Sequence, residues 1–112
     1  MDRTDQEAAL RWAFSEKRLF YRLHALLEMA EDDVTAELVV EAGCACEVLD
    51  EYTRRREGLT KLLLGYFEGD EPLHVVVNVQ RFESNFEARL EVVTVYRPRT
   101  PKWADERTRG MR

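Results

Sequence analysis

The side chains best suited to acid–base chemistry lie on two segments whose residues alternate between apolar and polar. His74 falls on the polar side of residues 73–80, a position that suits a general base or a contact to a phosphate group. Tyr96 and Arg97 end the second segment, residues 89–97, where a phenol and a guanidinium could orient and neutralise a phosphodiester. The alternative is structural, with a histidine that bonds to its neighbours, a packed tyrosine and a solvated arginine.

Other basic side chains are weaker candidates for phosphate contacts. They lie outside the two segments and equally fit solvated positions: Arg54, Arg55, Lys61 and Lys102. His24 stands four residues before Glu28, which is the spacing of a simple contact on a helix surface. The sequence contains no phosphate-binding glycine loop, zinc-protease motif or paired CxxC motif. These patterns leave metal-free RNA chemistry or no chemistry.

The two cysteines, Cys44 and Cys46, are separated by one residue. Neighbours this close seldom form a strain-free disulfide, and two thiols without a further Cys or His pair make a poor zinc site. We therefore expect reduced, partly buried thiols and a protein without a metal or cofactor.

Length and composition predict one domain, residues 1–112. With 112 residues, of which 45% are hydrophobic, the chain can bury a core without disulfides. It has no apolar run long enough to cross a bilayer and no signal-peptide pattern, so we expect a cytoplasmic protein. The net charge of −5 is uneven, because residues 1–53 carry 5 basic and 13 acidic side chains, against 12 and 9 in residues 54–112. This acidity weakens a nucleic-acid interpretation but leaves room for a local basic face.

The first third of the sequence predicts helices that position the strands. Residues 4–7 fit a capping box, and a helical pattern continues over residues 5–30 as one helix or two. From Leu19 to Ala30 apolar residues recur at three- and four-residue spacing, which predicts an amphipathic helix lying on a sheet. A short second helix is expected over residues 36–42, with Thr35 or Asp33 as its cap and Gly43 as its left-handed stop.

The remaining sequence predicts four consecutive antiparallel strands, over residues 44–52, 60–68, 72–80 and 89–97. On the third strand an apolar face should pack on the helices; it consists of Leu73, Val75, Val77 and Val79. Tyr96 could occupy either face of the sheet, since a one-residue slip in register exchanges the two faces of a strand. Phe82 and Phe86 lie in a loop that either folds back on the sheet or binds a partner. A helical turn is expected to pack Trp103 back on the fold.

Four blocks of this sequence resemble a bacterial domain of unknown function, family 4258. The blocks are Leu62-Leu-Leu-Gly-Tyr66, Pro72-Leu-His-Val-Val-Val77, Val93-Thr-Val-Tyr-Arg-Pro98 and Lys102-Trp103. His24, Ala25 and Met29 also fit a helix motif of that family. The resemblance covers about residues 19–103, which leaves residues 1–18 as an N-terminal helical extension and residues 104–112 as a basic tail.

That family is similar in layout to the RelE/ParE-like toxins. The resemblance implies an α+β fold with two N-terminal helices packed on a four-stranded antiparallel sheet. It also implies the toxin component of a type II toxin–antitoxin module, a metal-independent endoribonuclease bound by a protein antitoxin. In that mechanism His74 or Tyr96 lies near the attacking 2′-hydroxyl and Arg97 stabilises the phosphorane.

Two departures from the family pattern count against nuclease activity and lead to an alternative beside the toxin hypothesis. Glu28 stands where the helix motif has arginine, and Asp32-Asp33-Val34 replaces the usual Arg-Gly-Ile. Two basic groups are lost in a chain that is already acidic. The alternative hypothesis is therefore a catalytically silent protein-interaction module of the same fold, which binds a protein through its sheet face or the Phe82/Phe86 loop.

Overall fold

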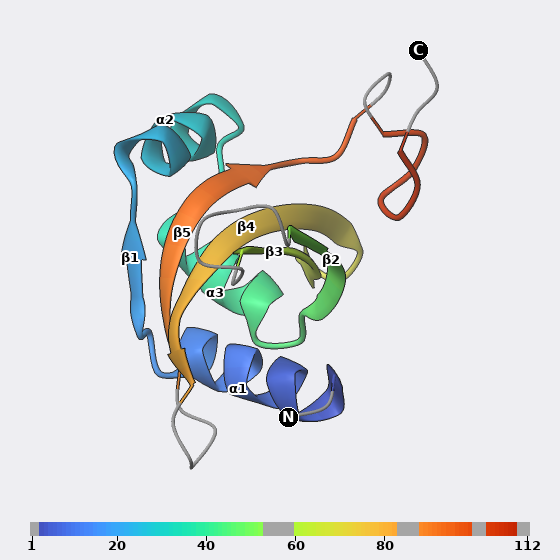
Figure 1. Ribbon diagram of the computed structural model, residues 1–112. Coiled ribbons are helices and arrows are strands. Elements are labelled where there is room, and N and C mark those ends of the chain that lie inside the picture. Colours follow the sequence, from blue (N-terminus) through green and yellow to red (C-terminus); the bar gives the residue numbers. More distant parts are fainter. Residues whose placement is uncertain (1–2, 53–59, 83–87, 100–102, 110–112) are drawn as a thin grey trace.

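The computed structural model describes residues 3–52, 60–82, 88–99 and 103–109. Its elements follow in the order α1 (Arg3–Ser15), β1 (Leu19–Tyr21), α2 (Leu23–Glu31), α3 (Ala36–Gly43), β2 (Glu47–Tyr52), β3 (Thr60–Phe67), β4 (Glu71–Phe82) and β5 (Ala88–Tyr96). Within the described residues the strands form one mixed sheet in the order β1-β5-β4-β3-β2. Helices α1 and α3 cover one face of this sheet, and α2 lies against β5 above the end of β1 (Figure 1). The predicted α+β class is confirmed.

The expected long amphipathic helix is wrong at its start, because Leu19–Tyr21 forms strand β1. Lys17 adopts a left-handed φ of 56°, which ends α1 and turns the chain onto the sheet edge. There β1 pairs in parallel with β5, with Leu19 opposite Leu90. The sheet is therefore mixed and five-stranded, and three helices precede β2 where two were expected. Three consecutive apolar residues fit a buried helix and a strand equally well, so periodicity misassigned them.

Two predicted helix ends also differ from the structure. Residues 4–7 form no capping box, since α1 already begins at Arg3 and the Glu7 carboxylate accepts a hydrogen bond from the N–H of Val48 at 2.7 Å. Gly43 is not a left-handed stop but the last residue of α3. A Cβ atom at Gly43 would lie 2.0 Å from Cγ of Phe14, so glycine is required for the close packing of α1 on α3. The predicted cap of α3 is confirmed, because Thr35 Oγ1 accepts from the N–H of Leu38 at 3.2 Å.

The core lies between the sheet and the helices. The predicted apolar face of β4 is confirmed, and its residues are buried among side chains of α1 and α3: Leu73, Val75, Val77 and Val79. Helix α3 packs directly on β3, since a Cβ atom at Gly65 would lie 2.1 Å from the carbonyl oxygen of Ala42. Strands β2 to β5 pair antiparallel with their sequence neighbours, as predicted, although β2 begins at Glu47 and not at Cys44. No helix of the described residues is long and apolar enough to cross a membrane.

Candidate functional site

A β-bulge in β5 decides which side of the sheet Tyr96 occupies. The strand carries one extra residue, Val93, between the residues that pair with Val76 and Val77 of β4. The extra residue shifts the alternation of β5 by one position, and Tyr96 becomes the direct partner of His74. The structure thus brings two of the predicted site residues together on the face opposite the helices.

The His74 side chain is fully enclosed on this face. Its Nε2 atom lies 2.7 Å from the carbonyl oxygen of Glu106, and its Nδ1 atom lies 3.1 Å from the hydroxyl oxygen of Tyr96. Because a carbonyl only accepts, Nε2 carries the proton, and in the neutral ring Nδ1 accepts from the tyrosine. The ring also meets Tyr96 and Trp103 edge to face, with centroid distances of 5.1 and 4.4 Å. His74 is 0% exposed, so both of its nitrogens serve internal contacts.

Residues 103–109, here called the C-terminal segment, cover the His74 side chain. Trp103 is buried with Leu62 and Val76, which form a second small core on this face. A bridge between Trp103 and Arg109 shapes the segment, in place of the helical turn that the sequence predicted. The packing of Trp103 back on the fold is confirmed.

Further polar contacts fix the C-terminal segment to strands β2 and β3. Glu106 accepts a hydrogen bond from the Tyr66 hydroxyl at 3.0 Å, and Arg107 donates to Glu47 at 2.5 Å. The Arg109 guanidinium lies 3.3 Å from the Tyr52 hydroxyl and stacks over the Trp103 ring at 4.7 Å. The segment is therefore anchored at several points along the sheet and at its edge.

Burial sets the protonation of Tyr96. Removal from water raises the pKa of its phenol to about 12, because the charged phenolate loses its hydration. Near neutral pH the phenol keeps its proton and can donate it in the hydrogen bond to His74. A protonated, buried tyrosine is suited to holding the histidine in place and not to accepting a proton from a substrate.

Arg97 does not join the His74–Tyr96 pair. Its guanidinium lies over the ring of Phe67 at 4.9 Å, on the side of the sheet that the helices cover. Its backbone N–H donates to the carboxylate of Asp32 at 3.1 Å, and its Nε donates to the carbonyl of Asp32 at the same distance. A further carboxylate, that of Glu71, lies 3.8 Å away. The contacts fasten the end of β5 to the loop that follows α2.

The predicted RNA-contacting residues are not assembled around His74. Lys61 is 4% exposed and its ammonium donates to Glu51 at 2.8 Å. It pairs with Val77, whose side chain lies in the core beneath the helices, so Lys61 lies on the opposite face from His74. The other three predicted contacts, Arg54, Arg55 and Lys102, lie outside the described residues, as does Phe86.

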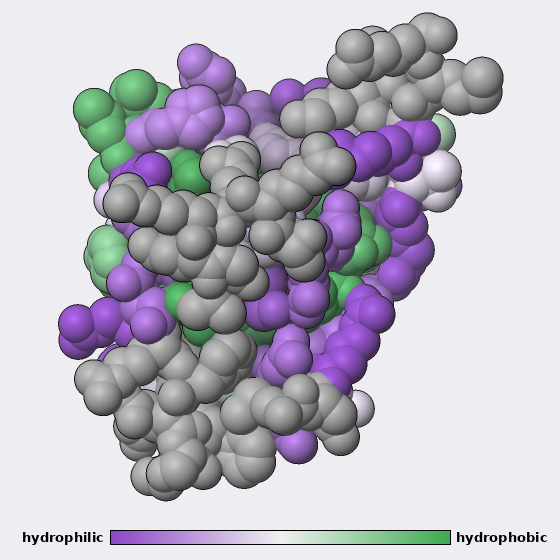
Figure 2. Space-filling view, viewed as in Figure 1, coloured by the Kyte–Doolittle hydropathy of each residue, from purple (hydrophilic) through white to green (hydrophobic). Residues whose placement is uncertain are grey.

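Sequence reasoning missed an exposed apolar surface on β1 and α2, because it assigned these residues to the core. Four large side chains are open to solvent, and we call them the apolar edge: Phe20 (44% exposed), Leu23 (71%), Leu26 (46%) and Leu27 (56%). Helix α2 turns Ala25 and Met29 toward the sheet instead. Figure 2 shows apolar side chains gathered over α2 and, paler, over β1 along the same side of the molecule. Apolar residues surround much of α2, so spacing alone could not select its buried face.

Two carboxylates, those of Glu28 and Asp32, explain how α2 is oriented. Glu28 accepts a hydrogen bond from the N–H of Val95 at 3.0 Å, and Asp32 accepts from the N–H of Arg97. The two carboxylates thereby bind backbone groups at the end of β5. With that side of α2 held on the sheet, the leucines point outward.

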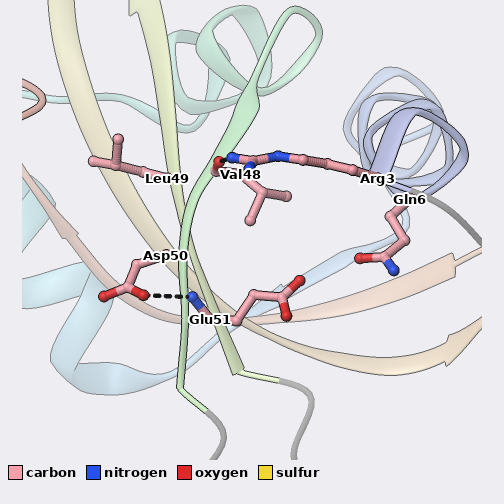
Figure 3. A pocket seen from close by; sticks show the side chains of 6 residues that line it. All are labelled: Arg3, Gln6, Val48, Leu49, Asp50 and Glu51. Carbon is pink, nitrogen blue, oxygen red and sulfur yellow. Dashed lines mark hydrogen bonds between the residues drawn. The ribbon is translucent and has the colours of Figure 1, made fainter.

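In the described part of the chain, hollows border the sheet beside α1 and beside α3. One, of about 330 Å³, lies between the start of α1 and β2, and Figure 3 shows its lining by Arg3, Gln6, Val48, Leu49, Asp50 and Glu51. Its charged groups already form internal pairs, since Glu51 binds Lys61 and Asp50 lies 3.8 Å from Arg109. The other hollow, of about 400 Å³, lies between β1 and α3 and is lined by Lys17, Leu19, Tyr21, Ala36, Glu37 and Val40. We call it the β1–α3 pocket.

Metal and thiol chemistry find little support in the part of the chain that the structure describes. There, no three His, Cys, Asp or Glu side chains come together in a way that could hold a metal ion. Cys44 is exposed and Cys46 is buried, and both are free thiols. Burial raises the pKa of Cys46 to about 12, so its thiol stays protonated and unreactive near neutral pH.

Comparison with known proteins gives one match. The family model described as "Domain of unknown function (DUF4258)" matches residues 21–97, which span α2, α3 and strands β2 to β5. No curated protein and no solved structure matches the chain.

Proposed function

The chain belongs to the DUF4258 family, and we propose that it is a protein-interaction module without catalytic activity. The observation that carries this proposal is the apolar edge, where four large hydrophobic side chains within eight residues are 44–71% exposed. Full burial of one such side chain contributes about 1.5–3 kcal/mol. Contiguous exposed apolar residues of this kind are typical of surfaces that bind another protein. A partner that covers the apolar edge would gain about half of this contribution from each of the four side chains, because they are already partly buried.

The burial of His74 and the position of Arg97, two predicted catalytic residues, support the same proposal. His74 is fully buried beneath the C-terminal segment, and Arg97 lies on the other side of the sheet. A general base must come within hydrogen-bonding reach of its substrate, which the cover over His74 prevents. In this arrangement the His74–Tyr96 pair holds the C-terminal segment in place.

The test compares the wild-type protein with a variant of the apolar edge. Leu23→Gln, Leu26→Gln and Leu27→Gln together remove the apolar surface while keeping helix propensity close to that of leucine. The matched control carries His24→Gln and Glu31→Gln, two exposed polar positions of the same helix. Proteins retained from an extract of the source cells are identified, purified and then titrated against all three forms.

We expect a partner that binds wild type and control equally and binds the apolar-edge variant at least about tenfold more weakly. Equal binding of one purified partner to all three forms would contradict the proposal. So would the absence of a partner that binds the wild-type protein.

A second candidate function is the toxin-like endoribonuclease neutralised by a protein antitoxin. Direct contact between His74 and Tyr96, at 3.1 Å, favours it, because two side chains able to handle protons meet on one sheet face. RNA could reach them only after the C-terminal segment has moved away. Induced expression should then arrest growth and cleave RNA, and His74→Ala or Tyr96→Phe should relieve the arrest. Normal growth with intact RNA, while folded and unbound protein accumulates, would rule this candidate out.

A further inference from the structure

Among the described residues, β1 is an edge strand with no strand paired on its outer side. Its ladder with β5 uses alternate residues, since Arg18 C=O accepts from Leu90 N–H at 3.0 Å and Arg22 N–H donates to Val92 C=O at 2.9 Å. In a parallel ladder of this register Phe20 supplies the bonds in between. The backbone N–H and C=O groups of Leu19 and Tyr21 therefore point away from the sheet, as in a strand that lacks its next neighbour.

Beside this edge, apolar side chains are incompletely covered on both faces of the sheet. Leu19 and Tyr21 turn their side chains toward the helices, where they line the β1–α3 pocket of about 400 Å³. Phe20 turns to the other face, where it is 44% exposed and precedes the exposed leucines of α2. An additional strand next to β1 would place alternate side chains into the pocket and onto Phe20.

We propose that β1 receives an extended segment of a partner protein, which adds to the sheet as a sixth strand. The inference rests on the proposed function and specifies how the partner binds. Main-chain hydrogen bonds to Leu19 and Tyr21 give affinity, and the alternate side chains of the segment give specificity. One side chain enters the β1–α3 pocket, and the next covers Phe20 and the adjoining part of the apolar edge.

A helix seated on the apolar edge would explain the structure less completely. It would cover the leucines of α2, but it offers no backbone groups to Leu19 and Tyr21. Those polar groups would then be desolvated next to the interface without a hydrogen-bond partner, at a cost of about 1–3 kcal/mol for each group. A strand satisfies the backbone groups and covers apolar side chains on both faces.

Charge opposes a second copy of this chain at this edge. The exposed side chains of Lys17, Arg18 and Arg22 directly flank β1. Two copies that meet at this edge would bring these positive charges together, which disfavours self-association. The pocket itself is lined by both Lys17 and Glu37. Burial raises the pKa of Tyr21, and the nearby carboxylate of Glu37 raises it further.

The Tyr21 hydroxyl gives the pocket a further preference. It is enclosed, and among the described residues it has no hydrogen-bond partner. An uncharged donor side chain entering the pocket could donate to this hydroxyl and to Glu37 without repulsion from Lys17, with its methylene groups against Leu19 and Val40. The segment that fits best therefore alternates apolar residues with uncharged hydrogen-bond donors.

The test selects a display library of random linear peptides against the wild-type protein. We expect enriched sequences in which apolar and uncharged polar residues alternate with a period of two. A synthetic peptide of the most enriched sequence is then titrated against two variants, Tyr21→Val and Tyr21→Pro. Both variants remove the phenol, but only proline removes the outward N–H, and an edge strand tolerates proline on its open side.

Tyr21→Pro should weaken binding at least about tenfold relative to Tyr21→Val, with both variants folded by circular dichroism. Enriched sequences with apolar residues at three- and four-residue spacing would overturn strand addition in favour of a helical partner. Equal binding by the two variants, or selection without any enrichment, would overturn it as well. Self-association of the free protein that Tyr21→Pro abolishes would instead identify a second copy as the occupant.

The outcomes separate this inference from the proposed function. If the triple leucine variant loses the natural partner while Tyr21→Pro binds it as Tyr21→Val does, the interaction module stands and strand addition is wrong. If the triple leucine variant keeps its partner, the proposed function itself fails.

Discussion

Two surfaces of this sheet outside the main core, one around His74 and one around β1, differ in whether other parts of the chain cover them. Around His74, the C-terminal segment covers the sheet with Trp103, which is 3% exposed, and with the Glu106 carbonyl, which accepts a hydrogen bond from Nε2 of the histidine. Around β1, large apolar side chains of 44–71% exposure and an open strand edge remain without cover from the described chain. Buried polar groups that are satisfied internally indicate a structural role, whereas an uncovered apolar surface indicates a binding role.

Replacement of Trp103 should have the largest effect on stability, because this side chain covers the surface around His74. Trp103→Ala removes the buried indole that covers His74 and leaves a cavity, which should lower the free energy of unfolding by about 3–5 kcal/mol. Urea denaturation measures this loss. A change below about 1 kcal/mol would show that the C-terminal segment is only loosely applied to the sheet.

Tyr96→Phe should have a smaller effect on the same surface. It removes the hydroxyl that bonds to His74 Nδ1 and leaves a buried nitrogen with one contact fewer, at a cost of about 1–2 kcal/mol in unfolding free energy. The variant should also lose the tyrosine that titrates at about pH 12, which ultraviolet absorbance detects. Loss of a component that titrates near pH 10 instead would contradict the burial of this phenol.

Stability should fall in alkali because of the same residue. The pKa of Tyr96 is raised from 10.0 to about 12 in the folded protein, so its contribution is complete below pH 10 and is lost as the pH rises toward 12. In the Tyr96→Phe variant this part of the alkaline decline should be absent. Identical stability profiles of variant and wild type between pH 9 and pH 12 would contradict this prediction.

Acid should loosen the C-terminal segment through Glu47. The hydrogen bond from Arg107 holds the pKa of this carboxyl below its ordinary value of 4.5. A lowered pKa stabilises the folded state above about pH 4.5, and this contribution is lost as the pH falls through the pKa of the folded protein. Fluorescence of Trp103, recorded with Trp12 replaced by phenylalanine, should change in this range. Glu47→Gln should remove that pH dependence, and its persistence would contradict the assignment.

The apolar edge should give the smallest change in stability. Leu26→Gln exchanges a side chain that is 46% exposed for one of similar helix propensity, so the free energy of unfolding should change by no more than about 0.5 kcal/mol. Urea denaturation measures it beside Trp103→Ala. A loss above about 2 kcal/mol would mean that Leu26 belongs to the core and that the contrast between the two surfaces is false.

The sequence predicted the strands better than the surfaces that they form. Alternation and turn residues located β3, β4 and β5 closely, and the apolar face of β4 was correct. The face of Tyr96 depended on the bulge at Val93, which places one extra residue in a strand of otherwise regular alternation. Alternation without register cannot locate such a residue.

The candidate site was predictable only as a list of residue types. His74 and Tyr96 do meet, but burial by a distant segment of the chain decides what they do, and no local pattern around either residue encodes that cover. The apolar edge was missed for a related reason. Periodicity assigned Leu23, Leu26 and Leu27 to the core, whereas the carboxylate contacts of Glu28 and Asp32 hold the other side of α2 against β5.

The central claim is that the protein acts through its apolar edge and not through the His74 face. The most direct measurement is the affinity of one purified natural partner for the triple leucine variant and for a Tyr96→Phe variant, each compared with the wild-type protein. The account predicts a loss of at least about tenfold for the leucine variant and no more than about twofold for Tyr96→Phe. Full affinity of the leucine variant together with a large loss for Tyr96→Phe would contradict it.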